Sequence, residues 1–292
     1  MYAISDQEFT QFQRFIFDAA GISLSPAKKA LVCGRLAKRL EARGLDSYAA
    51  YFALLKSGQE GAETQMAIDL LTTNETYFFR EPRHFEVLVR EARDAHGQEQ
   101  GEDQEPAPAR KPKLVQGRAP QLRTGQPYRV WSAASSTGEE AYTIAMVLHD
   151  SLGGRPFEVV GTDISTRVVT RARTGHYSEQ RGRQIPPAML KRYCLKGLGP
   201  QAGTFLVDRA LRQHVRFSHA NLNAPLPDLG AFDAVFLRNV MIYFNGETKR
   251  QVVTRVLSQL KPGGVLFVGH SESLHGIDAG VTAVMPSVYR KV

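Results

Sequence analysis

From residue 128 onward the sequence alternates short apolar segments with amphipathic ones, and this alternation restricts the fold more than any other feature. The strand-like segments are YRVWSA (128–133), FEVVGTD (157–163), HVRFSHA (214–220), FDAVFLRN (232–239) and GVLFVGHSE (264–272). Helical patterns separate several of them, over 138–152, 165–173 and 246–260. The alternation predicts an α/β domain with an open, mostly parallel sheet wrapped by helices. Ligands bind such sheets beyond the carboxyl ends of the strands, so a site is expected there.

The residues before this domain follow a different pattern. Residues 1–80 predict a small all-helical domain, whose first helix begins at a capping box formed by Ser5 and Glu8. Residues 81–127 predict a connecting helix followed by a linker rich in Pro, Gln and Gly, because 94–126 holds almost nothing to bury. The α/β domain takes the remaining 128–292.

Composition narrows the class of protein. Of the 292 residues 42% are hydrophobic and 23% are charged, which is typical of a globular chain without a membrane span. Cys33 and Cys194 form no CxxC pair and indicate neither a disulfide framework nor a zinc site, as in a reducing compartment. The start MYAISDQEF lacks a signal-peptide pattern, and no apolar run approaches the roughly 18 residues that span a bilayer. We expect a cytoplasmic protein that does not insert into membranes.

Positive charge is concentrated in two places along the chain. The net charge is +8, and 28–43 holds six Lys or Arg against one Glu. Segment 165–196 holds eight Lys or Arg, again against one Glu. Such clusters favour an acidic partner, which leaves both nucleic acid and an acidic protein surface open.

The loop WSAASSTGEEA resembles a dinucleotide-binding turn that has lost most of its glycines. Gly138 is the only glycine, Ala133 and its neighbours fill the other places, and Glu139 and Glu140 open the next helix. The glutamates are also favourable as simple helix caps. Beside a pyrophosphate, two carboxylates would cost roughly a few kcal/mol, which disfavours NAD. A cofactor with an amino group and a positive sulfur, such as S-adenosylmethionine, would suit them.

Polar residues follow three further strands. Asp163 lies about 25 residues beyond the loop, where an acidic side chain accepts hydrogen bonds from ribose hydroxyls, although it could equally cap the next helix. Asn221 and Leu222 follow the next strand, as contacts for an adenine or as a structural turn. Arg238 and Asn239 end the strand after that.

Six motifs together resemble one family, the chemotaxis receptor methyltransferases known as the CheR family. They are LTTNETYFFRE, RVWSAASSTGEEAYTIAM, VVGTDIS, VRFSHANL, FDAVFLRNVMIYF and LKPGGVLFVGHSES. The resemblance covers nearly all of the chain, in the family's order and, apart from the linker, at its spacing. It implies a Rossmann-like S-adenosylmethionine-dependent methyltransferase domain with a seven-stranded sheet, an N-terminal helical domain and a small antiparallel β-subdomain, at about 197–215.

The resemblance also implies an activity and a set of site residues. Members methylate glutamate side chains on the cytoplasmic helical bundle of chemoreceptors and form methyl esters, leaving S-adenosylhomocysteine; no metal is expected. Arg80 and Tyr243 match the positions that handle the substrate carboxylate and are the predicted catalytic residues. The predicted cofactor-binding residues are Asn74, Thr76, Arg80, Ala133, Glu140, Asp163, Asn221, Leu222, Arg238 and Asn239.

The predicted partner contacts follow from the same resemblance. The helical domain faces the receptor, so the basic residues Lys28, Arg35, Arg39 and Arg43 are expected to contact acidic methylation helices, unless they form an ordinary solvated face. The β-subdomain binds a receptor C-terminal peptide in some members. We expect a monomer.

Two other functions are weighed against this one. A catalytically silent receptor-docking module would keep the fold, but the presence of both Arg80 and Tyr243 argues against it. A nucleic-acid methyltransferase would explain the basic clusters. Amino-methylating enzymes of that kind usually carry an Asn/Asp-Pro-Pro-aromatic stretch where this chain has RNVMIYF, so we expect no nucleic acid partner.

Overall fold

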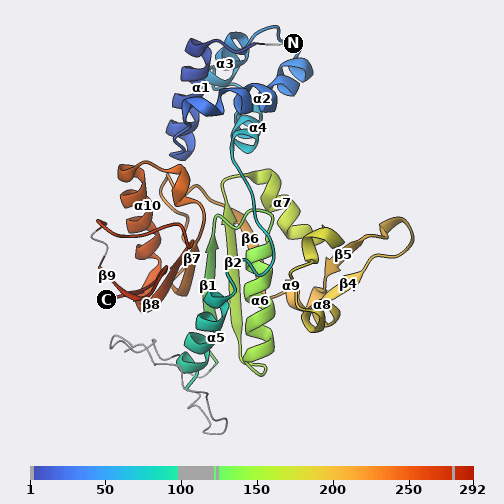
Figure 1. The fold of residues 1–292 in the computed structure, drawn as a ribbon, viewed down its shortest axis with the longest axis vertical. Coiled ribbons are helices and arrows are strands. Elements are labelled where there is room, and N and C mark those ends of the chain that lie inside the picture. Colours follow the sequence, from blue (N-terminus) through green and yellow to red (C-terminus); the bar gives the residue numbers. More distant parts are fainter. Residues whose placement is uncertain (1–2, 98–121, 123–124, 278–279) are drawn as a thin grey trace.

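The computed structural model describes residues 3–97, 122, 125–277 and 280–292. It shows a helical domain, an α/β domain and a small antiparallel sheet beside the α/β domain (Figure 1). Most of the predicted linker over 94–126 lies outside the described residues.

The helical domain contains the first four helices. They are α1 (Asp6–Ala20), α2 (Lys29–Arg43), α3 (Tyr48–Lys56) and α4 (Gly61–Leu71). Both halves of the predicted capping box at the start of α1 are present, because the Ser5 hydroxyl accepts from the Glu8 amide and the Glu8 carboxylate accepts from the Ser5 amide. After α4 the irregular segment 72–77 leads down to the α/β domain, and the predicted connecting helix follows as α5 (Arg83–Ala95).

In the described part of the chain the main sheet has seven strands in the order β6-β2-β1-β7-β8-β10-β9. Their bounds are β1 (Tyr128–Ala133), β2 (Phe157–Asp163), β6 (Val215–His219), β7 (Phe232–Leu237), β8 (Leu260–Val268), β9 (Val281–Met285) and β10 (Val288–Lys291). The first five run parallel, whereas β10 and β9 pair antiparallel at the edge beside β8. The predicted mostly parallel, seven-stranded sheet is therefore confirmed.

Helices cover both faces of this sheet because the strands are apolar on both sides. Along β1, Val130 faces the layer of α5, α6 (Glu139–Ser151) and α7 (Thr166–Thr174), whereas Trp131 faces α10 (Gly246–Ser258). In β7, Phe232 packs on the α10 side and Phe236 packs on the side of α5, α6 and α7. The core of the helical domain is continuous with the α10 side.

The small sheet lies at one side of the α/β domain (Figure 1). Its strands are β3 (His176–Ser178), β5 (Thr204–Val207) and β4 (Cys194–Lys196), with β5 in the middle. It therefore begins some twenty residues before the range 197–215 predicted for the subdomain. Two of its strands have only three residues, too few for an alternating pattern to be recognised. The short helices α8 (Pro187–Tyr193) and α9 (Arg209–Arg212) flank it.

No described helix combines the length and the apolar composition that a membrane crossing requires.

Candidate active site

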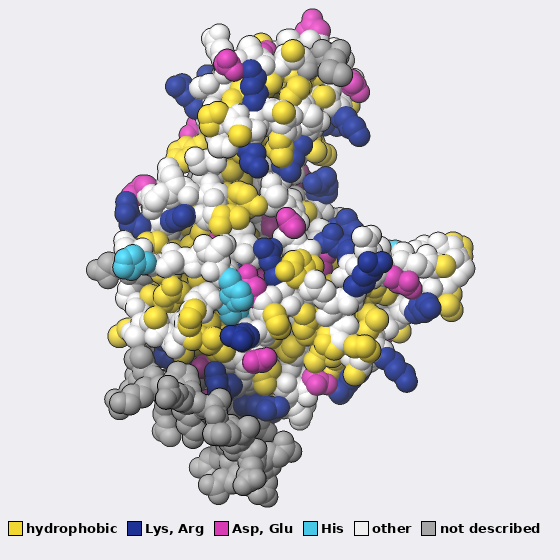
Figure 2. Space-filling view, viewed as in Figure 1, with side chains coloured by type: hydrophobic (Ala, Val, Ile, Leu, Met, Phe, Trp, Pro, Cys, Tyr) yellow, Lys and Arg dark blue, Asp and Glu magenta, His cyan; other side chains and the backbone are white. Residues whose placement is uncertain are grey.

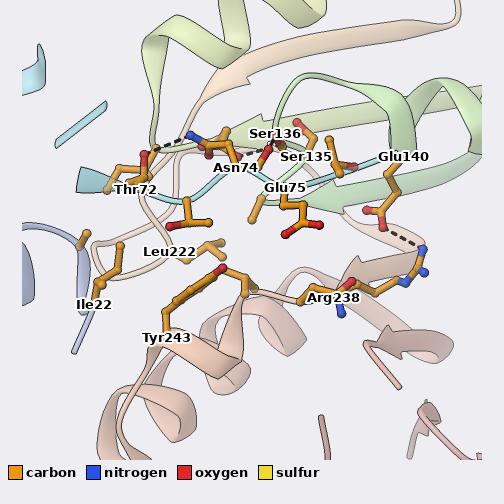
Figure 3. A pocket seen from close by; sticks show the side chains of 18 of the residues that line it. Ile22, Thr72, Asn74, Glu75, Ser135, Ser136, Glu140, Leu222, Arg238 and Tyr243 are labelled. Atoms are coloured by element: carbon orange, nitrogen blue, oxygen red, sulfur yellow. Dashed lines mark hydrogen bonds and ion pairs between the residues drawn. The ribbon is translucent and has the colours of Figure 1, made fainter. Parts of the chain in front are cut away.

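A cavity lies at the carboxyl ends of the parallel strands, next to the end of α1 of the helical domain (Figure 3). Segment 72–77 crosses one side of it, and the residues after β1, β2, β6 and β7 supply the rest. Ala20 and Ile22, at the end of α1, close it from the helical domain. The position agrees with the expectation for an open α/β sheet.

Most of the predicted site residues come together here. Those that line the cavity are Asn74, Thr76, Arg80, Glu140, Asp163, Asn221, Leu222, Arg238, Asn239 and Tyr243. Ala133 does not: it is the last residue of β1 and its side chain is buried in the core. The next residue, Ala134, lines the cavity instead, with a left-handed backbone (φ 62°) that turns the chain toward it.

The loop after β1 is held by hydrogen bonds to main-chain carbonyls of neighbouring segments. The Ser135 amide donates to the carbonyl of Thr162 at 2.8 Å, and the Ser136 hydroxyl donates to the carbonyl of Asn74 at 3.0 Å. Gly138 ends the loop at φ 96°, where a Cβ atom would stand 2.9 Å from the Cβ of Ala172. The single glycine is therefore required both by its backbone conformation and by the close packing of α7.

Glu140 and Arg238 form a nearly buried ion pair at one end of the cavity (Figure 3). The Arg238 Nη1 lies 3.0 Å from the Glu140 Oε2, and the Ser132 hydroxyl donates to the other carboxylate oxygen at 2.7 Å. Arg238 also contacts Glu81 at 2.9 Å and donates to the carbonyl of Arg80 at 2.6 Å. Burial raises the pKa of Glu140, and the guanidinium opposes that rise. The charge of Glu140 is thus largely balanced within the protein.

Asp163 ends β2 with both carboxylate oxygens engaged. They accept from the amides of Ser136 and Ser165, each at 2.9 Å, so that the side chain joins two adjacent loops. Burial raises the pKa of Asp163 to about 6, against the effect of these two hydrogen bonds.

Asn221 holds the helical domain in place. Its Nδ2 donates to the carbonyl of Ala19 at the end of α1 at 2.7 Å, and its Oδ1 accepts from the Asn223 amide at 2.9 Å. Both polar atoms of the side chain are used within the protein. The neighbouring Leu222 lines the same wall with an apolar surface.

Arg80 and Tyr243 face the same cavity from different elements. Arg80 follows segment 72–77, donates to the carbonyl of Glu75 at 3.3 Å and stacks over the Tyr77 ring at 5.4 Å. Tyr243 comes from the turn after β7, is half-buried, and points its hydroxyl into the cavity (Figure 3). Burial and then the nearby Glu75 raise the pKa of Tyr243, so the phenol keeps its proton at neutral pH.

The four basic residues predicted to contact the receptor differ in their surroundings. Arg39 makes a bidentate pair with the buried Glu63, at 2.8 and 2.5 Å, and Arg43 pairs with Glu60. Arg35 donates to the carbonyl of Thr72 at 2.9 Å and so anchors the chain where it enters the cavity. Lys28 is exposed. Figure 2 shows Lys and Arg side chains along the boundary between the helical and α/β domains.

Three acidic residues have surroundings that the sequence patterns do not predict. Glu139 was expected beside Glu140 at the mouth, but it is fully buried outside the cavity and pairs with Arg181. Glu75 lines the cavity although no strand end or helix cap marks it. Asp69 of α4 accepts from the amides of Thr166 and Arg167, and thus caps α7 from the other domain. Only their tertiary contacts distinguish Glu139 and Asp69 from ordinary surface carboxylates.

One group of potential metal ligands occurs among the described residues. Ligand atoms of Glu81, His84 and His270 lie within 4.8 Å of one another. Burial lowers the pKa of His84 to about 4, so the ring is neutral at pH 7. Arg238, however, already pairs with Glu81 at 2.9 Å and would repel a cation placed there.

Family models match both domains of the chain. The family model described as CheR methyltransferase, all-alpha domain matches residues 7–72, and that described as CheR methyltransferase, SAM binding domain matches residues 103–289. The chain belongs to the CheR methyltransferase family. Its α/β domain is the family's S-adenosylmethionine-binding domain, and the cavity lies at its strand ends.

Curated CheR relatives are similar along almost the whole chain. A chemotaxis protein methyltransferase of Salmonella typhimurium is 40% identical over 282 residues, which cover 94% of this chain and 86% of the relative. One from Escherichia coli is 39% identical and covers 98% and 91%. Chemotaxis protein methyltransferase 2 of Pseudomonas aeruginosa is 38% identical and covers 97% and 92%.

Proposed function

We propose that this chain transfers the methyl group of S-adenosyl-L-methionine to glutamate side chains on the cytoplasmic helical bundle of chemoreceptors. The product is a glutamate methyl ester, as used in sensory adaptation. One observation carries the proposal. The residues predicted to handle the substrate carboxylate, Arg80 and Tyr243, line the same cavity as the residues at the strand ends that are predicted to bind the cofactor.

The residues of the cavity fit the cofactor by their chemistry. Asp163 is the last residue of β2, a position at which a carboxylate accepts hydrogen bonds from ribose hydroxyls in related nucleotide-binding sheets. Leu222 offers an apolar surface to a base, and Asn74 and Thr76 add amide and hydroxyl groups. When bound, S-adenosylmethionine supplies a methyl group that needs no metal for its activation.

Arg80 and Tyr243 then have complementary tasks. A glutamate carboxylate is ionised at neutral pH, so the enzyme needs no strong base and acts by orientation. Arg80 holds a carboxylate oxygen by charge, and Tyr243 donates a hydrogen bond without adding charge. The raised pKa of Tyr243 keeps this donor protonated.

The partner surfaces are part of the same proposal. Lys28 is exposed and free to meet an acidic helix, whereas Arg39 and Arg43 must share their charge with acidic neighbours in the helical domain. Leu195 of the small sheet and Leu198 of the loop that follows β4 are exposed, which supports docking of a receptor C-terminal peptide there. The enzyme acts as a monomer, which light scattering in solution would test.

A methyl-transfer assay tests the proposal directly. The full chain is incubated with methyl-labelled S-adenosylmethionine and a receptor cytoplasmic fragment, and the label is expected to be released by mild base, as from an ester. Arg80→Ala should lower the rate about 10²-fold and Tyr243→Phe about tenfold. Arg250→Ala, which removes an exposed arginine of α10 that does not line the cavity, is the control.

Each competing function predicts another result. A docking module would bind the fragment without incorporating label. A nucleic-acid enzyme would transfer label to DNA or RNA and bind it with a steep salt dependence. Unchanged rates in both Arg80→Ala and Tyr243→Phe would contradict the roles assigned to these residues.

A further inference from the structure

Glu272 is a buried carboxylate to which the proposed function gives no role. It follows β8 in the motif LKPGGVLFVGHSES, only 8% of it is exposed, and it does not line the cavity. A buried charge is costly unless hydrogen bonds compensate for the lost water. Here the main chain supplies that compensation, because the carboxylate accepts hydrogen bonds from three backbone amides.

Two of these amides belong to the turn after β7, which carries Tyr243. The Asn239 amide donates to Oε2 of Glu272 at 2.7 Å, and the Ile242 amide donates to Oε1 at 3.2 Å. The third amide, that of Gly269, donates to Oε2 at 2.8 Å and belongs to the chain that leaves β8. Glu272 therefore fastens the turn after β7 to the end of the neighbouring strand.

The backbone of this turn depends on such contacts. Asn239 has a left-handed conformation (φ 57°), which is uncommon for a residue other than glycine and persists where the surroundings impose it. Gly269 leaves room for the anchor, because a Cβ atom there would stand 2.8 Å from Oε2 of Glu272 and would collide with the Asn239 side chain. From the helical domain, the Ser23 amide donates to the carbonyl of Tyr243 at 2.8 Å. The turn is thus held from two sides.

Resting on the proposed function, we propose that Glu272 is a positioning residue for methyl transfer, whose carboxylate fixes the turn 239–243 and thereby places the Tyr243 hydroxyl against the substrate carboxylate. Tyr243 points its hydroxyl into the cavity, so the place of the hydroxyl follows that of the turn (Figure 3). A hydrogen bond weakens steeply when donor and acceptor move apart or out of line. Misplacement of a reacting group by about 1 Å costs up to about 10²-fold in rate.

Glu272→Gln tests this role, because it keeps the size of the side chain and changes its hydrogen bonds. A Gln side chain has one acceptor oxygen, whereas its amino group only donates. The oxygen is expected to stay with the two amides at Oε2, so the amino group faces the Ile242 amide and the turn loosens next to Tyr243. The rate of transfer to a saturating receptor fragment should fall about five- to tenfold, whereas the dissociation constant for S-adenosylmethionine should change less than about twofold.

A double-mutant cycle with Tyr243→Phe separates positioning from a general structural effect. In the Tyr243→Phe background, Glu272→Gln should lower the rate less than about twofold, because the hydroxyl that it positions is already absent. Glu272→Asp keeps both acceptor oxygens but draws them back by one carbon, and its loss should likewise vanish in that background. Glu247→Gln, at the exposed start of α10, makes the same exchange as Glu272→Gln and should leave both rates unchanged. All variants are assayed well below their melting temperatures.

The outcomes distinguish this inference from the proposed function. Equal losses in the two backgrounds, an unchanged rate in Glu272→Gln, or a cofactor dissociation constant that rises as much as the rate falls would each overturn the positioning role. In all three cases the unaltered chain remains an active methyltransferase. If the unaltered chain transferred no methyl group to the fragment, the proposed function would itself fail.

Discussion

The buried carboxylate of Glu139 gives the sharpest prediction for stability. Glu139 is fully buried at the start of α6, and its partners are the guanidinium of Arg181 and the hydroxyl of Thr137. Arg181 lies in the turn after β3, and its Nη2 also donates to the carbonyl of Thr76 at 3.1 Å. Arg181→Gln removes the only cation that contacts Glu139 among the described residues.

The size of the effect follows from the burial of each partner. Breaking a fully buried ion pair by removing one member costs about 3–5 kcal/mol. The side chain of Arg181 is 30% exposed, so water can partly replace it. We therefore expect Arg181→Gln to lower the free energy of unfolding by about 2–3 kcal/mol. For a domain of this size the loss corresponds to roughly 5–10 °C in melting temperature. Adding Glu139→Gln should restore much of the loss, because no unpaired charge then remains.

Urea and thermal unfolding of the single and double variants measure these values. Arg192→Gln is the matched control, because the side chains of Arg192 and its partner Asp150 are both exposed (57% and 40%). Loss of this pair should lower the free energy of unfolding by less than about 1 kcal/mol. The reasoning is refuted if Arg181→Gln is no less stable than Arg192→Gln. It is equally refuted if the double variant is less stable than Arg181→Gln alone.

Three further predictions concern the site and the domain interface. Burial raises the pKa of Asp163 to about 6, so the affinity for S-adenosylmethionine should fall as the pH drops through about 6, because the carboxylate gains a proton and loses acceptor capacity. An affinity that calorimetry finds constant between pH 5 and 8 would argue against contact of Asp163 with the ribose. Asp69→Ala should lower the free energy of unfolding by about 1–2 kcal/mol, since it removes the acceptor of the Thr166 and Arg167 amides in the first turn of α7, and an unshifted urea midpoint would show that this contact is dispensable. Lys28→Ala should raise the KM for a receptor fragment without changing the melting temperature. Arg39→Ala should lower the melting temperature, because Glu63 then stays buried without its bidentate partner. Equal melting temperatures for the two variants would contradict this distinction.

The sequence alone determined the architecture and the location of the site. Strand segments such as YRVWSA and FEVVGTD coincide with β1 and β2, because fully buried parallel strands are apolar along their whole length. The parallel sheet in turn brings Asp163, Asn221 and Arg238 to one edge, although they are far apart in the chain. Local patterns suffice here because strand direction, and hence the position of each strand end, follows from the connections.

Only the tertiary structure decided which charges remain available. Glu139 and Glu140 are adjacent in sequence, but successive helical residues point about 100° apart, so one is buried against Arg181 and the other lines the cavity. Glu75 lies in a segment without regular structure, and the sequence has no periodicity there to orient it. The small sheet was misplaced for the same reason, since three-residue strands are stabilised by their neighbours rather than by a local pattern. Ion pairing and burial depend on residues distant in sequence, and only the folded chain brings these together.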